Sequence, residues 1–167
     1  PVYETANQVS KLLHMIKEKE EASLRELCPT KEAREALDKR VYYPELGASV
    51  SKRYLLEMAS HTGSESNRRV LFGKAPVGLE KSSLRVRNAD GKVDAETMAM
   101  TKDRVMNFVA QNLTAAEWEW VQRGWDNINL LWPLAQEVHQ RMTGFFIQKV
   151  EALPFETKTA DGQTVVL

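Results

Sequence analysis

The longest hydrophobic pattern of the chain lies between Leu113 and Pro133, where apolar residues recur at alternating spacings of three and four. These positions share one face of a helix: Trp118, Val121, Trp125, Ile128 and Trp132. Thr114 and Glu117 form a capping-box pair at its start, and Leu113 and Trp118 have the spacing of a hydrophobic staple. We therefore predict that this helix is the central packing element of the protein.

A first helix is predicted from Thr5, with Gln8 in a capping box, to Cys28, because Pro29 disfavours the helical conformation in the residue before it. Its apolar positions are Val9, Leu12, Leu13, Ile16, Leu24 and Leu27. A second helix begins after Thr30 and ends at Tyr42-Tyr43-Pro44, with Ala33, Ala36, Leu37 and Val41 on its buried side.

A third helix is predicted from Ser51 to His61, followed by Gly63 as a stop signal. Ser64 then caps a short fourth helix that Gly73 ends. Glycine, proline and serine make residues 73–93 a long loop, with a brief strand at 84–87 and a turn at Asp90-Gly91. Loops of this length in compact domains are usually either functional or mobile.

Asp94 caps the fifth helix, whose predicted inner face is Met98, Val105, Phe108 and Val109. The short link at 112–113 predicts that this helix and the tryptophan helix are antiparallel neighbours. Pro133 indicates either a kink or the start of a new helix. The spacing favours a kink, because Ala135, His139 and Met142 continue it in phase up to Gly144.

Residues 148–167 read as a terminal β segment, with Asp161-Gly162 as the turn of a hairpin. The predicted fold is mainly α, a bundle of about six helices with a long central loop and a small C-terminal β-hairpin, in a single domain over residues 1–167. The chain starts at Pro1 without a methionine and ends in a β-type run, so we expect a fragment of a larger protein.

Composition is that of an ordinary globular protein, with 43% hydrophobic and 28% charged residues. The net charge is zero, so no overall field favours nucleic acid or an anionic membrane. No apolar run approaches the length of a membrane span. The single Cys28 excludes an internal disulfide and a cysteine-rich metal site.

The residues that could carry chemistry are scattered. His14, His61 and His139 lie far apart with no metal-ligand spacing, and no catalytic or phosphate-binding motif is present. Carboxylates near the tryptophans could suit glycoside chemistry. However, Glu117 belongs to a capping box and Glu119 pairs with Arg123 at i+4. We predict no catalytic residue, metal or cofactor, although an enzyme site assembled only by the fold stays open.

Two surfaces are candidates for binding. A flexible loop rich in arginine can follow phosphates, which gives a nucleic-acid candidate of Arg68, Arg69, Lys74, Lys81, Arg85, Arg87 and Lys92. Tryptophans concentrate at interfaces, and although the regular stripe favours a core, a part of it can face a partner. The interface candidates are Trp120, Trp132 and His139. The flank of the helix beyond Pro133 and the basic loop are therefore favoured over the stripe itself.

Four segments resemble a module of the large multidomain polyvalent proteins of tailed bacteriophages: YLLEMASHTGSESNRRVLFG, LTAAEWEWVQRGWDNINLLWP, MTGFFIQKVEALPF and TADGQTVVL. The likeness covers about residues 54–167. Where the family often reads Gly-Asn-x-x-Asn, this chain has Ser64 after Gly63, which departs from the pattern.

The resemblance implies a virion-carried protein that is injected with the DNA, located in the virion or in the host cytoplasm after delivery. It implies no catalytic residue. We therefore expect a non-enzymatic structural or interaction module, with the rest of the parent chain or other virion proteins as partners. The alternative is a nucleic-acid-contacting module of a phage DNA- or RNA-processing protein.

Overall fold

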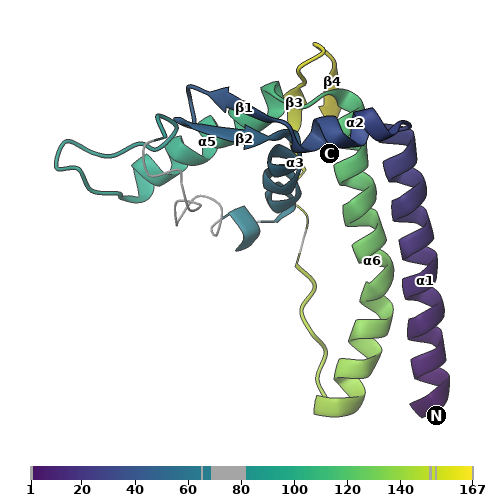
Figure 1. Cartoon of the computed structure of the whole chain (residues 1–167). Coiled ribbons are helices and arrows are strands. Elements are labelled where there is room, and N and C mark those ends of the chain that lie inside the picture. Colours follow the sequence, from purple (N-terminus) through teal and green to yellow (C-terminus); the bar gives the residue numbers. More distant parts are fainter. Residues whose placement is uncertain (1, 65, 69–81, 151, 153, 167) are drawn as a thin grey trace.

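The computed structural model describes residues 2–64, 66–68, 82–150, 152 and 154–166, and shows a head with a long helical arm (Figure 1). The helices are α1 (Val2–Leu27), α2 (Lys31–Asp38), α3 (Lys52–Ser60), α5 (Ala95–Gln111) and α6 (Ala115–Thr143), with the 3-10 turn η1 (His61–Gly63). Two antiparallel hairpins complete it: β1 (Arg40–Tyr43) with β2 (Ala48–Ser51), and β3 (Glu156–Lys158) with β4 (Thr164–Val166). The predicted mainly α fold with a small C-terminal hairpin is confirmed.

The arm consists of α1 and the C-terminal part of α6, which run side by side in opposite directions (Figure 1). Asn127 Nδ2 of α6 donates to Glu20 Oε1 of α1 at 2.6 Å. The predicted antiparallel pairing of α6 with α5 is wrong, because α6 turns away from α5 and packs along α1 instead. α6 passes through Pro133 without ending, so a new helix starting there is also wrong.

The local start and stop signals of α6 are as predicted. Thr114 and Glu117 form both bonds of the capping box, and Gly144 ends the helix in the left-handed region at φ 78°. α1 ends at Leu27, one residue before the predicted end at Cys28, and it begins at Val2, before the predicted cap at Thr5.

The core lies in the head, where α3, α5, the β1–β2 hairpin and the first turns of α6 meet. The largest fully buried side chains are Trp118, Leu46, Leu55, Leu113, Val109, Val121 and Thr62. The inner face of α5 differs from the prediction at one position. Met98 is 39% exposed, whereas Thr97 and Thr101 are buried, because their hydroxyls bond to the capping Asp94 and to the backbone of Val86.

Residues 40–43 form strand β1, which corrects the prediction that they end the second helix. Val41 pairs with Val50 in the hairpin, and Gly47 makes the turn possible at φ 63°. Valine and tyrosine fit a pleated, half-buried surface better than a helix end. Helix α2 therefore stops at Asp38.

The described part of the 73–93 loop contains the predicted turn but not the predicted strand. Gly91 has φ 74° and its amide donates to Asn88 O at 2.9 Å. Residues 84–87 form no ladder, since the amide of Val86 donates to the Thr101 hydroxyl at 2.9 Å instead. Residues 73–81 lie outside the described residues, as does most of the predicted fourth helix. Its cap is formed: Ser64 Oγ accepts from the amide of Asn67 at 3.3 Å.

The C-terminal hairpin covers the start of α6. Its turn has Gly162 at φ 77°, as predicted. The amide of Ala160 donates to Leu113 O at 2.8 Å, and Asp161 Oδ1 accepts from the amide of Ala115 at 3.1 Å. The carboxylate of Asp161 therefore lies at the positive end of the helix dipole.

Cys28 lies in the core at 4% exposure. Burial, followed by the negative charge of Glu117, raises the pKa of its thiol. Because the thiolate is the reactive form, we expect Cys28 to react with a disulfide reagent at pH 7.4 at least about tenfold more slowly in the folded protein than in guanidinium chloride. Equal rates in the two conditions would contradict this packing.

Candidate functional site

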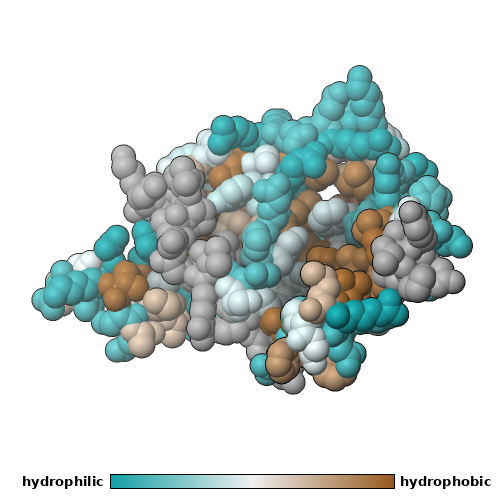
Figure 2. All heavy atoms as spheres, turned by 90° about the horizontal axis from the view of Figure 1, so that it is seen from below, coloured by the Kyte–Doolittle hydropathy of each residue, from teal (hydrophilic) through white to brown (hydrophobic). Residues whose placement is uncertain are grey.

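The far end of the arm exposes a cluster of large hydrophobic side chains. Met142 is 80% exposed, Phe145 is 73% exposed and Phe146 is 67% exposed. Figure 2 looks at the molecule from below, and it shows hydrophobic side chains among polar ones at this end. Gly144 brings these residues together, because its left-handed backbone ends α6 and turns the chain back toward the head. We call Met142, Phe145 and Phe146 the arm end.

The chain after Gly144 runs back toward the head, and we call its described residues from Phe145 to Pro154 the returning segment (Figure 1). Two side chains of α6 hold its beginning in place. Gln136 donates from Nε2 to Ile147 O at 3.1 Å, and Gln136 Oε1 accepts from the amide of Ile147 at 2.8 Å. His139 Nδ1 is 2.9 Å from Phe145 O. A carbonyl can only accept, so this contact requires the hydrogen on Nδ1. The exposure of the two phenylalanines therefore belongs to a segment with a defined backbone.

A groove of about 580 Å³ lies where the arm joins the head. It runs between α6, the turn after α3 and the returning segment, and these described residues line it: Ser60, Gly63, Ser64, Ser66, Asn67, Gln122, Trp125, Ile128, Asn129, Lys149, Val150, Ala152 and Pro154. Its size is that of a ligand-binding site, and its walls combine apolar side chains with a few polar groups.

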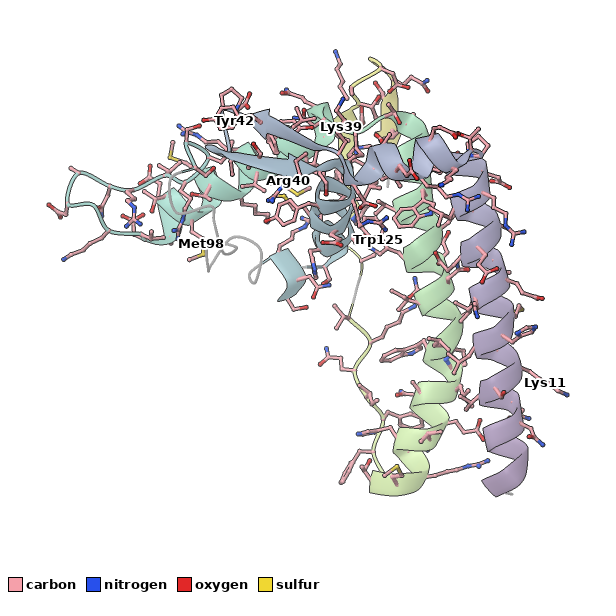
Figure 3. The ribbon with its side chains drawn as sticks, viewed as in Figure 1. Lys11, Lys39, Arg40, Tyr42, Met98 and Trp125 are labelled. Carbon is pink, nitrogen blue, oxygen red and sulfur yellow. The ribbon has the colours of Figure 1, made fainter. Side chains whose placement is uncertain are left out.

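Trp125 forms a fixed wall of this groove. It extends from α6 toward α3 (Figure 3), and its Nε1 donates to Ser60 O at 3.0 Å. Gly63 packs closely on the ring, since a Cβ at this position would lie 2.8 Å from Trp125 Cε2. The indole is therefore held in place and its ring is partly covered by the glycine backbone.

Three polar side chains of the groove have no partner among the residues that the structure describes: Asn67, Asn129 and Lys149. Asn67 comes from the short helical segment at 66–68, and Asn129 comes from α6. Gln122, one heptad before Asn129, donates to Asp126 Oδ1 at 2.9 Å. The groove thus offers unused hydrogen-bonding groups from two different walls.

The predicted interface residues have three different environments. Trp120 is half-buried beside α1, where it and Ser23 line a small cavity of about 90 Å³. Trp132 is half-buried on the arm. His139 holds the returning segment at the arm end. The sequence did not indicate Gln136, because its partner is a backbone group that any residue carries.

The predicted basic surface is divided. Arg68 is 6% exposed, donates to Thr62 O at 2.5 Å and lies 5.5 Å from the centre of the Phe155 ring. It is a structural residue and cannot reach a phosphate in this conformation. Arg69, Lys74 and Lys81 lie outside the described residues. The remaining candidates, Arg85, Arg87 and Lys92, are half-buried or exposed, and Arg87 donates to Gly91 O at 2.9 Å.

The charged residues near the tryptophans form the ion pair predicted for them. Glu119 pairs with Arg123 at 2.7 Å, as predicted, and Arg123 also pairs with Glu26 of α1. Across the part of the chain that the structure describes, no group of three or more metal-ligating side chains comes together. In the same part, no helix is long and apolar enough to cross a membrane.

Comparison of the chain with protein-family models, with curated proteins and with solved structures finds no match.

Proposed function

We propose that this chain is a non-enzymatic interaction module of a large bacteriophage protein, and that it binds a partner protein through the arm end. The phage context rests on the resemblance of the tryptophan helix and its flanking segments. In this context the partner is another part of the parent protein or another virion protein, in the virion or in the host cytoplasm after delivery.

The exposure of Phe145 and Phe146 carries the proposal. Covering one such side chain stabilises a complex by about 1.5–3 kcal/mol. Clustered exposed apolar groups on a folded domain mark binding surfaces. Hydrogen bonds from Gln136 and His139 fix the backbone beneath them, so little conformational entropy is lost on binding.

The double variant Phe145→Ser/Phe146→Ser tests this proposal. We expect affinity capture from infected cells to retain a partner on the unchanged chain. The amount of partner retained by the double variant should be at least about tenfold lower. The matched control is Met98→Ser/Met100→Ser, which removes two exposed methionines of α5 at 39% and 44% exposure.

If the partner binds specifically at the arm end, the methionine variant should retain as much partner as the unchanged chain. Capture that survives the phenylalanine variant, with helicity by circular dichroism unchanged, would overturn the proposal. Nucleic-acid contact through Arg85, Arg87 and Lys92 stays a prediction, since no contact of the described residues favours it over the arm end.

A further inference from the structure

Three carboxamide side chains follow one another along α6 at a spacing of seven: Gln122, Asn129 and Gln136. We call them the amide row. Residues seven apart lie two turns apart on nearly the same face of a helix. The row runs from the groove toward the arm end, beside the tryptophan stripe.

Gln136, the member of the amide row nearest the arm end, already binds a backbone segment of this chain. Gln136 exchanges two hydrogen bonds, of 3.1 and 2.8 Å, with the carbonyl and amide of Ile147. A carboxamide has one acceptor and donors on the same plane, so it matches both polar groups of one residue in an extended chain. Residues 147–150 have no regular secondary structure, and Figure 1 shows them as part of an extended trace that runs back toward the head.

One heptad closer to the head, Asn129 lines the groove and has no partner within the described part of the chain. Asn67, from the short helical segment at 66–68, offers a second carboxamide without a partner among the described residues. Ile128 at 67% exposure and Val150 at 59% exposure provide apolar surface beside them. The groove therefore presents, beside the returning chain, an exposed carboxamide of the kind that binds Ile147 one heptad further along α6.

We propose that the groove binds a short extended peptide segment of a partner protein, held through its backbone by Asn129 and Asn67 with an apolar side chain against Ile128 and Val150. This inference rests on the proposed function as an interaction module. A nucleobase or a sugar fits less well, because both are usually held by stacking on a free aromatic ring. The ring of Trp125 is fixed by Ser60 and covered in part by Gly63.

The test uses the whole chain and a displayed library of random heptapeptides. We expect enriched peptides that share apolar residues. The best of them is then synthesised with a fluorescent label, and its Kd is measured by anisotropy. Asn129→Ala is expected to weaken binding about tenfold, the value of one lost pair of hydrogen bonds. Ile128→Ser is expected to weaken it by a similar factor.

Both substituted side chains are exposed, so the fold does not depend on them. The matched control is Asn107→Ala, which removes an exposed carboxamide from α5 and should leave the Kd unchanged. Recognition of the backbone has its own readout. One N-methylated version of the peptide should bind about tenfold more weakly to the unchanged chain, and Asn129→Ala should not weaken that version further.

The absence of any enriched heptapeptide that depends on both Asn129 and Ile128 would overturn the inference. That failure is separate from a failure of the proposed function, since partner capture through the arm end depends on Phe145 and Phe146. The phenylalanine variant could lose the partner while the peptide selection finds no binder. In that case the proposed interaction module would stand, and the groove would not be its peptide site.

Discussion

Replacing Trp118 by alanine is expected to lower the free energy of unfolding by about 3–5 kcal/mol. Trp118 is fully buried, and its ring meets the edge of Phe155 at a centroid distance of 5.5 Å. The substitution leaves a cavity where α6 enters the head, and it removes the contact that holds the chain before the C-terminal hairpin. Urea denaturation followed by circular dichroism measures the loss.

The indole Nε1 of Trp118 is buried and has no hydrogen-bond partner among the described residues. Trp118→Phe removes this unpaired donor together with part of the ring, so the two effects partly offset each other. We expect a cost of about 1–2 kcal/mol for this variant.

Ile128 provides the matched control, because it belongs to the same stripe but is 67% exposed. Ile128→Ala should change the free energy of unfolding by less than about 0.5 kcal/mol. Equal losses for Trp118→Ala and Ile128→Ala would show that the stripe is buried along its whole length, and the exposed groove wall would then be wrong.

The second large effect is expected at Glu117, which joins three elements through one carboxylate. Its Oε2 accepts from the amide of Thr114 at 2.7 Å and from Lys52 Nζ at 3.3 Å. Lys52 also donates to Asn112 O at 2.7 Å, so α3, the end of α5 and the start of α6 meet at this point. The carboxylate side chain is 11% exposed.

Glu117→Ala is expected to cost about 2–4 kcal/mol, since it removes the capping box and leaves the half-buried Lys52 without its counter-charge. Glu117→Gln keeps an acceptor oxygen and should cost roughly half as much. Thermal and urea unfolding of the unchanged chain and of the two Glu117 variants measure the order of their stabilities.

Glu119→Ala is the control for this position, because its carboxylate is 63% exposed and pairs with Arg123 on the surface. Exposed pairs contribute about 0–1 kcal/mol, so its effect should be small. A loss at Glu119 as large as that at Glu117 would mean that helix charge, and not the Lys52 contact, determines the stability of this corner.

These stability effects separate the two halves of α6. The first turns of the helix hold the head together through Trp118 and Glu117. The second half is supported by α1 and the returning segment, and it leaves Ile128, Met142 and the phenylalanines accessible. The variants proposed for the arm end and the groove therefore test binding without removing core contacts.

Local patterns in the sequence determined the element boundaries that depend on nearby residues. The capping box of Thr114 and Glu117, the stop at Gly144 and the hairpin turn at Gly162 are confirmed, because each is made by contacts within a few residues. The preference for the flank beyond Pro133 followed from the interpretation of the stripe as core, and it stays a prediction. The exposure of Phe145 and Phe146 did not follow from it, since a two-residue apolar run fits a core equally well.

Only the tertiary structure decided which surfaces of these elements meet. The sequence could not show that α6 packs along α1 instead of α5, because both helices carry an apolar face of suitable spacing. It also could not show that Gln136 binds Ile147, because a backbone partner has no sequence signature. Periodicity and caps are local properties of the chain, whereas the partner of each face, the burial of Arg68 and the open groove depend on long-range packing.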